Sequence, residues 1–253
     1  EGPCLSQGLR RSGRGVRAGG GGSADHFQKH GLTTPEDLEK ILRHKSNREL
    51  AIPMENYMKN NFPFLGIKNQ SRKAILKPLW SEYKEEIKSN FRNITLALFD
   101  KKEREFHYCA MEIIFKEINK KFVREDIQLI EKLITKNSWW DSVDAIASIL
   151  VGHYFTVYPQ KIDKYIISWS KDEHLWVRRT SIIFQLKYGV KTDWELLQRC
   201  IYNNLNSKEF FINKAIGWAL RQYAKTNPSE VKELVLHTNL SNLSKREALK
   251  HIG

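Results

Sequence analysis

Helical periodicity restricts the fold of this chain more than any other feature of its sequence. From about residue 35 onward, apolar residues recur every three to four positions in one segment after another, with short breaks between them. No segment shows the strict alternation, flanked by turn residues, that is typical of a strand. Two segments illustrate the pattern with a single apolar face each: Phe106, Cys109, Ala110, Ile113 and Ile114 in the first, and Ile162, Tyr165, Ile166 and Trp169 in the second. The sequence therefore predicts an all-α protein.

The breaks between these segments indicate how the helices are grouped. They fall at "NFPFLGIKN", "KNS", "YPQ", "KYGVKT", "NLNS" and "TNP", and they pair the helices into units of about 40 residues, the period of HEAT-like repeats. We expect about six such pairs, stacked as a right-handed α-solenoid with one concave face. A compact helical bundle is the alternative.

The first 24 residues differ from the rest of the chain. They contain eight of the 14 glycines and no apolar period, so residues 1–24 are predicted to be a disordered tail. The tail resembles either a linker left from cloning, as "GGGGS" favours, or the end of an arginine-rich transit peptide. Residues 25–253 are predicted to form a single domain. No apolar run approaches the roughly 18 to 20 residues of a membrane-spanning helix.

The charge of the chain suggests its partner. The formal net charge is +13, and four arginines and one glutamate in the tail leave +10 on the predicted domain. Such an excess favours a polyanionic partner, and nucleic acid before a membrane because no basic amphipathic surface helix stands out. A solvated lysine-rich surface is the alternative reading.

Cysteine and histidine usage argues against metal or disulfide chemistry. Cys109 and Cys200 stand singly within helical patterns and Cys4 is in the tail, which indicates a reducing compartment without a disulfide framework. The eight histidines lack paired-ligand spacing. We expect no metal site and no cofactor.

The segment "TKNSWWDSVDAIASIL" carries two tryptophans and two aspartates within six positions. Ser138 and Asp141 fit a capping box, and Trp139 fits the apolar stripe that continues through Val143. Trp140 and Asp144 are left without a structural role, and their four-residue spacing places them on the same helical face. The pair is therefore a candidate site.

Two further residues also lack an obvious structural role. Arg179 lies beside an apolar stripe, where it needs an acid or a ligand phosphate, and a structural salt bridge is as good an explanation as function. Trp218 lies off the core stripe of its helix and would ordinarily be a partly buried surface residue.

Basic and polar residues gather at predicted helix starts, where free amides and the helix dipole favour phosphate. These candidate DNA contacts are Lys68, Gln70 and Arg72 in "KNQSRK", Lys208 after Ser207, and Lys245 with Arg246 inside a capping box from Ser244 to Glu247. Taken singly, each position would be an ordinary helix cap.

Five segments, "YMKNNFPFLGI", "TKNSWWDSVD", "LWVRRTSIIFQLKY", "SKEFFINKAIGWALRQYAKTNP" and "LSKREALKHI", closely resemble the AlkD family of HEAT-like-repeat DNA glycosylases. The resemblance covers most of residues 45–252. It implies that Trp140, Asp144, Arg179 and Trp218 form the catalytic cleft and that Tyr57 lies on the same DNA-facing surface. The chain departs from the family in its N-terminal tail and at Pro53. A proline in the interior of a helix would bend that helix.

The resemblance also implies a function. The expected activity is monofunctional excision of cationic alkylated purines, 3-methyladenine and 7-methylguanine, from duplex DNA, with Asp144 stabilising the oxocarbenium-like sugar, Arg179 holding a flanking phosphate and the base not necessarily flipped. We expect a monomer without a membrane partner, cytoplasmic and associated with the nucleoid, with an organelle or the nucleus as alternatives. The rival functions are a HEAT-type protein-binding scaffold and a DNA-binding relative without glycosylase activity.

Overall fold

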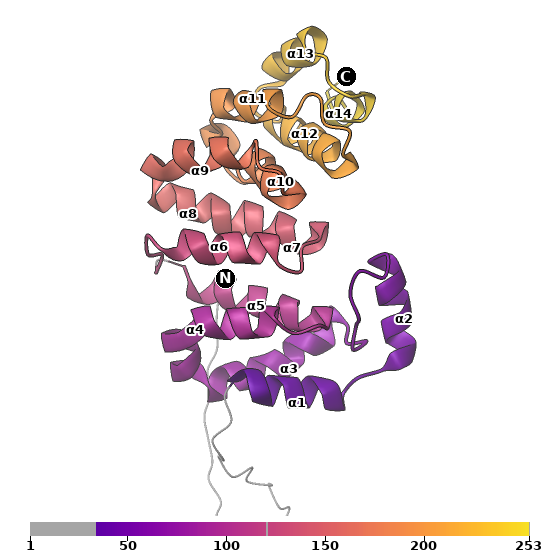
Figure 1. The fold of residues 1–253 in the computed structure, drawn as a ribbon, viewed down its shortest axis with the longest axis vertical. Coiled ribbons are helices and arrows are strands. Elements are labelled where there is room, and N and C mark those ends of the chain that lie inside the picture. The colour runs from indigo at the N-terminus through magenta and orange to yellow at the C-terminus, as the bar shows by residue number, and fades with distance from the viewer. Residues whose placement is uncertain (1–33, 120, 253) are drawn as a thin grey trace, which may run out of the picture. The chain divides into compact units, whose positions relative to one another are not determined.

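The computed structural model describes residues 34–119 and 121–252, so the predicted tail lies outside the described residues. In these ranges every regular element is a helix, which confirms the all-α prediction (Figure 1). In the first half of the chain the helices are α1 (Thr34–His44), α2 (Arg48–Tyr57), α3 (Asn69–Glu82), α4 (Lys84–Phe99), α5 (Arg104–Glu117) and α6 (Asp126–Thr135). The remainder are α7 (Trp140–Ala145), η1 (Ile146–Val151), α8 (Gly152–Val157), η2 (Pro159–Lys161), α9 (Ile162–Trp169), α10 (Leu175–Ile183), η3 (Gly189–Lys191), α11 (Trp194–Tyr202), α12 (Phe210–Tyr223), α13 (Pro228–His237) and α14 (Asn242–Ala248).

The helices end where the sequence predicts breaks. The "KNS" break separates α6 from α7, "KYGVKT" lies between α10 and α11, and "NLNS" lies between α11 and α12. Contacts between elements join α4 to α5, α10 to α12 and α12 to α14. Figure 1 shows these helices stacked one after another, an arrangement consistent with an α-solenoid.

The apolar faces predicted from periodicity form the core. All five residues of the α5 stripe, from Phe106 to Ile114, are fully buried, and in α9 Ile166 and Trp169 are buried while Tyr165 packs partly exposed against the same core. Burial of a large aliphatic or aromatic side chain contributes about 1.5 to 3 kcal/mol, so these stripes account for much of the stability. Among the described residues, no helix is long and apolar enough to cross a membrane.

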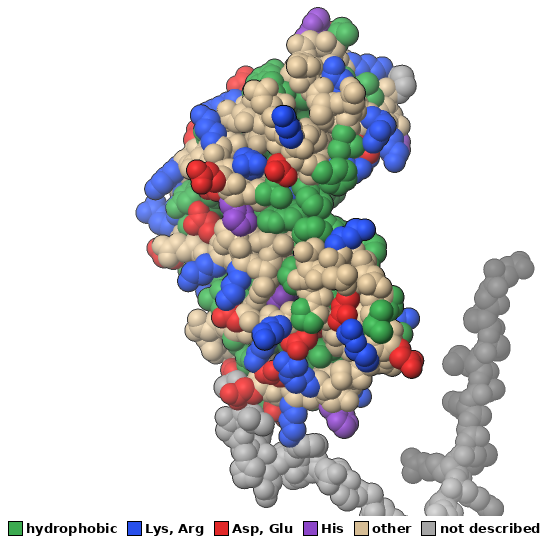
Figure 2. All heavy atoms as spheres, turned by 45° about the vertical axis from the view of Figure 1, so that its right-hand side comes forward, with side chains coloured by type: hydrophobic (Ala, Val, Ile, Leu, Met, Phe, Trp, Pro, Cys, Tyr) green, Lys and Arg blue, Asp and Glu red, His purple; other side chains and the backbone are tan. Residues whose placement is uncertain are grey.

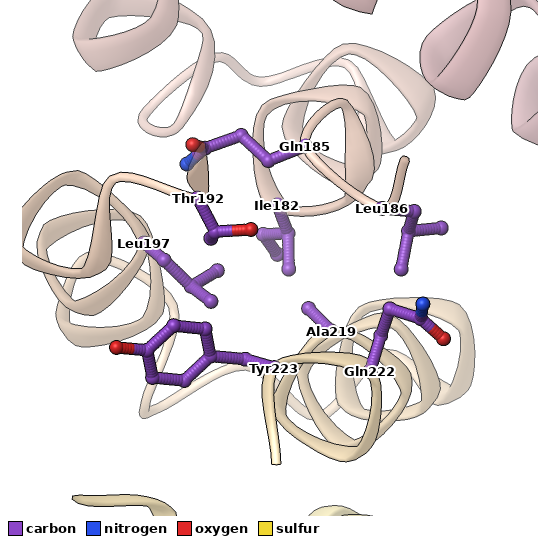
Figure 3. A pocket seen from close by; sticks show the side chains of 8 residues that line it. All are labelled: Ile182, Gln185, Leu186, Thr192, Leu197, Ala219, Gln222 and Tyr223. Carbon is purple, nitrogen blue, oxygen red and sulfur yellow. The ribbon is translucent and has the colours of Figure 1, made fainter. Parts of the chain in front are cut away.

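The second half of the core closes around a small gap between three helices. Figure 3 shows Ile182 of α10, Leu197 of α11 and Ala219 of α12 converging on it, and its volume is about 10 Å³. That space holds about one water molecule, so the gap is a packing feature rather than a ligand pocket. Gln185 closes the rim, because its amide binds the backbone N–H and C=O of Asp193.

A π-helical turn interrupts the helix that carries the tryptophan and aspartate pairs. α7 continues directly into η1 and then α8, so residues 140–157 form one helical run. The predicted stripe of Val143, Ile146, Ala147 and Leu150 is buried, although periodicity gave no indication of the π turn. Such turns are frequent at functional sites, and this one begins two residues after Asp144.

The loop between α2 and α3 is fixed by one buried carboxylate. Glu105 of α5 is fully buried, and its side chain accepts hydrogen bonds from the backbone N–H groups of Leu65, Gly66 and Ile67 at 2.9 to 3.1 Å. Gly66 has a φ of 82°, and a Cβ there would lie 2.0 Å from the Asn47 carbonyl oxygen. Only glycine fits this close approach, which explains how the loop "FPFLGI" can pack against both the start of α2 and Glu105 of α5.

Candidate functional site

Asp144 and Arg179 form a bidentate ion pair between α7 and α10. Nε and Nη2 of Arg179 donate to the two carboxylate oxygens of Asp144 at 2.7 and 2.9 Å. The Arg179 side chain is 4% exposed and that of Asp144 is 16% exposed, so the carboxylate reaches solvent while the guanidinium does not. Two residues selected from the sequence as lacking a structural role therefore lie in direct contact.

Arg179 also links this pair to a third helix. Its Nη1 donates to the backbone carbonyl of Phe211 in α12, and its guanidinium carbon lies 5.8 Å from the centre of the Phe211 ring. Three of its five N–H groups are directed to protein acceptors in this way. The contact of Arg179 with a DNA phosphate that the sequence suggested remains a prediction.

The electrostatics of Asp144 are set by burial and by two neighbours. Burial raises the pKa of Asp144 above its ordinary value, the hydrogen bonds and charge of Arg179 lower it, and the charge of Asp141 raises it further. The bidentate pair requires both oxygens as acceptors, which the ionised form provides. The site thus holds a negative charge in a partly desolvated position.

Asp141 occupies a separate, more deeply buried network. Arg104 of α5 is fully buried and donates to both Asp141 oxygens, at 2.5 and 3.1 Å, and Tyr108 donates its hydroxyl at 2.7 Å. Arg104 also donates to the Asn137 carbonyl and the Ser142 hydroxyl. Asp141 therefore connects the start of α7 to α5.

The predicted capping box at the start of α7 is wrong. The N-cap position is Trp139 and makes no side-chain cap bond, whereas the Ser138 hydroxyl donates back to the Ile134 carbonyl of α6. Asp141 does not reach the cap because both of its oxygens are bound by Arg104, and a buried charge pair outweighs a helix cap worth about 1 kcal/mol.

Aromatic rings flank the ion pair on both sides. Tyr57 of α2 packs edge-on against Trp140, with ring centres 6.0 Å apart, and Tyr57 is 67% exposed. Pro53 lies in the interior of α2, yet the helix continues to Tyr57. An exposed aromatic ring held next to the Asp144 helix offers a stacking surface at the edge of the site.

The other flank is a cluster that the sequence did not predict. Trp139 packs on the core as expected, but its ring partners are Trp176 of α10 and Phe211 of α12, at 5.6 and 5.2 Å. The Trp139 indole N–H is buried and has no acceptor among the described residues. Figure 2 shows hydrophobic side chains gathered where this face of the molecule is hollowed.

Trp218 lies on the same helix as Phe211, whose backbone carbonyl accepts a hydrogen bond from Arg179. It is partly exposed, packs on the core, and follows Phe211 by seven residues, or about 10 Å along α12. Among the described residues, no hydrogen bond joins Trp218 to Asp144 and no ring contact joins Trp218 to Trp140. The structure thus brings together Trp140 with Tyr57 and Asp144 with Arg179, while Trp218 stands two helical turns away from Phe211.

Sequence reasoning missed the partners of the two ion pairs: Arg104 and Tyr108 bind Asp141, and the Phe211 carbonyl accepts a hydrogen bond from Arg179. Arg104 stands at the start of α5, where nothing in the periodicity distinguishes it from an exposed residue, yet it is fully buried. The segment "SWWDSVD" gave one indication of such a partner. Two aspartates beside an apolar stripe become partly buried, and a buried carboxylate needs a cation to pair with.

Three of the predicted DNA contacts are exposed at helix starts. Lys68 is the N-cap of α3, Gln70 lies in its first turn, and Lys208 stands two residues before α12. All three side chains belong to exposed residues. They remain predicted backbone contacts.

The other three predicted contacts do not have the exposed helix-start setting that was expected, although their role in DNA binding stays a prediction. Arg72 is 7% exposed because its guanidinium pairs with Glu112 and lies over the Tyr108 ring, so it is a buried structural residue. Lys245 and Arg246 lie in the last turn of α14, whose N-cap is Ser241 rather than Ser244. The proposed box fails because Glu247 is bound by Lys214 and Arg221 of α12.

Among the described residues, no group of three or more His, Cys, Asp or Glu side chains could hold a metal ion. Cys109 and Cys200 are buried, free thiols in separate helices, and burial raises the pKa of each to about 12. Their thiols are therefore protonated at neutral pH and do not supply a nucleophile.

Comparisons with known proteins point to one family. The model of the DNA alkylation repair enzyme family matches residues 38–252. A solved structure described as a predicted DNA alkylation repair enzyme from Enterococcus faecalis is 34% identical, with a TM-score of 0.75, and the match covers 82% of this chain and 97% of that one. No curated protein matches the sequence.

Proposed function

The chain belongs to the DNA alkylation repair enzyme family, and from this premise we propose that it is a monofunctional DNA glycosylase that removes cationic alkylated purines from duplex DNA. Its role is in DNA repair and its partner is DNA. The finer activity is the hydrolysis of the N-glycosidic bond of 3-methyladenine or 7-methylguanine. We also propose that it acts as a cytoplasmic, nucleoid-associated monomer.

The observation that carries the proposal is the partly exposed Asp144 carboxylate held by Arg179. An alkylated purine of this type is already cationic, so it leaves with the bonding electron pair as a neutral base and needs no general acid. Positive charge then develops at C1′ of the deoxyribose. A fixed carboxylate in a partly desolvated position stabilises that charge far better than water does.

Asp144 also accounts for the second half of the reaction. Water adds to C1′ of the cation, and the proton that it releases passes to the carboxylate or to solvent. One carboxylate is sufficient here, whereas ordinary glycosidases use two because their leaving groups must be protonated. Arg179 keeps the carboxylate oriented, which removes the cost of ordering it during the reaction.

The partly buried Trp140 and the exposed Tyr57 beside Asp144 support the same function. Trp140 and Tyr57 present ring edges and faces where the sugar and backbone of a lesion would lie. A cationic sugar or base over such a ring gains about 0.5 to 2 kcal/mol. Trp218, on α12, is proposed to contact the duplex from the opposite flank.

Release of free base from methylated duplex DNA tests the proposal. Purified protein should release 7-methylguanine or 3-methyladenine and leave abasic sites without cutting the strand. Unmethylated DNA is the control. Protein that binds duplex with a steep dependence on salt but releases no base would be a non-catalytic relative, and protein without such binding would be a scaffold for other proteins.

A further inference from the structure

A groove of about 650 Å³ lies between α3 and α5, away from the Asp144 site. Lys73, Lys77 and Trp80 line it from α3, and Glu112 and Lys116 line it from α5. We propose that this groove binds the phosphate backbone of the duplex on one side of the lesion. The inference rests on the proposed function, because it takes DNA as the partner.

The positive charge of the groove is uncompensated. Lys73, Lys77 and Lys116 are exposed, and within the described ranges none of them forms an ion pair with a carboxylate. The acid that lines the groove, Glu112, is itself bound by the buried Arg72. Three lysines without ion-pair partners around one concavity, whose lining glutamate is already paired, create a local positive potential that attracts a polyanion.

One of these lysines is held in place before any ligand arrives. The Lys116 ammonium lies 3.8 Å from the centre of the Trp80 ring, and the Trp80 indole N–H donates to Glu117 at 3.2 Å. The ring therefore fixes the lysine, and Glu117 fixes the ring. A cation ordered in advance loses less side-chain entropy on binding than a free lysine does.

The spacing of the lysines fits a nucleic-acid backbone. Lys73 and Lys77 are four residues apart on α3, which separates them by about 6 Å along the helix. Phosphates of one strand advance by about 3.4 Å of duplex axis each, so the two ammonium groups span about two phosphate steps. Ammonium groups bind phosphates as point charges and read no sequence, as a backbone contact requires.

The groove is connected to the site by one face of α5. Tyr108, which donates to Asp141, is followed at four-residue intervals by Glu112 and Lys116. Lys116 therefore lies about 12 Å along α5 from Tyr108. This length equals three to four base-pair steps of a duplex, and Asp141, the partner of Tyr108, lies one helical turn before Asp144 on α7. That continuity favours DNA over an acidic protein segment as the occupant.

Paired charge reversals test the groove. The double variant Lys73→Glu with Lys77→Glu should bind duplex about tenfold more weakly than wild type. Its slope of log affinity against log salt should be smaller by about 0.9 for each lost phosphate contact. Lys164→Glu with Lys171→Glu, two exposed lysines outside the groove, makes the same charge change as a control. Lys73→Gln with Lys77→Gln removes the charges without adding acids, and all variants should melt near wild type.

Shortened duplexes locate the contact. Two lesion duplexes are compared, each ending two base pairs beyond the lesion on one side only. One duplex lacks the DNA that would reach the groove, and wild type and the groove variant should bind it equally. The duplex shortened on the opposite side keeps that DNA, so the tenfold difference in affinity should remain. An equal loss in the control pair, wild-type binding by both groove variants, or a difference that persists on both short duplexes would overturn the proposal.

The proposed glycosylase function is tested by a different measurement, the release of free base. Base release by the groove variant at saturating protein should stay within about twofold of wild type, because the groove lies outside the Asp144 site. If wild type itself releases no base, the glycosylase proposal is wrong, while the binding comparison on the same duplexes still decides what the groove does.

Discussion

Asp141 and Asp144 lie one turn apart on α7, yet each is bound by an arginine from a different neighbouring helix. Arg104 of α5 holds Asp141, and Arg179 of α10 holds Asp144. The first pair is almost fully buried, whereas the second leaves its carboxylate partly exposed. The two pairs on one helix differ in exposure, and under the proposed function this difference predicts different effects of the same substitution.

Asp144→Asn should reduce base release by at least about tenfold. The amide keeps the shape of the side chain but removes the charge, and each 1.4 kcal/mol of lost transition-state stabilisation lowers the rate tenfold. Arg179 loses a charged partner, so the free energy of unfolding should fall by about 1 to 2 kcal/mol. Single-turnover base release and urea unfolding measure both effects, and normal turnover would contradict the assignment of Asp144.

Asp141→Asn is the matched control and should have the opposite balance. It leaves the fully buried Arg104 without its charged partner, so the free energy of unfolding should fall by about 3 kcal/mol. Base release per folded molecule should change by less than about threefold. A loss of stability below about 1 kcal/mol would show that Arg104 does not depend on Asp141.

Glu105→Gln should loosen the loop that supports α2. The glutamine NH₂ group would meet a backbone N–H in place of an acceptor, so the free energy of unfolding should fall by about 2 kcal/mol. Amide hydrogen exchange at residues 65–67 should accelerate. Glu82→Gln, at the exposed end of α3, is the control, and unchanged exchange in Glu105→Gln would refute the role of this carboxylate.

His107 should make the protein sensitive to acid. It is fully buried, and burial, together with the charge of Arg104, lowers the pKa of His107 to about 4. A histidine kept neutral in the fold stabilises it fully above its unfolded pKa of about 6.5, and that contribution is lost as the pH falls toward about 4. Between these pH values about 3 kcal/mol should be lost. Urea unfolding of His107→Gln should show a flatter dependence on pH, and an unchanged dependence would exclude His107 as the cause.

Base release should lose activity in acid at a higher pH than an ordinary aspartate would impose. Burial raises the pKa of Asp144 above 3.8, and only the ionised form stabilises the sugar cation. Arg179→Met removes the charge that lowers this pKa, so the acid limb of the rate profile should move further upward, whereas Arg179→Lys should move it less. Rates are measured after subtraction of uncatalysed release, and an acid limb that does not move would contradict the electrostatic coupling of the pair.

The sequence by itself determined where the helices lie. It also identified residues that have no place in the apolar stripes of those helices. Periodicity is a local property, so the stripe of α5 and the breaks around α7 could be predicted from spacing alone. The same counting left Trp140, Asp144, Arg179 and Trp218 without a clear structural role, and two of these four, Asp144 and Arg179, proved to be direct partners.

Only the tertiary structure decided which charged side chains form ion pairs. Arg72 and Lys68 belong to one basic segment, yet Arg72 is buried against Glu112, 40 residues away, while Lys68 faces solvent. Asp141 was assigned to a local cap because a capping box is read from neighbours in sequence, whereas its partner Arg104 comes from another helix. The free energy of a buried ion pair depends on the distance and desolvation of groups far apart in the chain, and no local pattern contains that information.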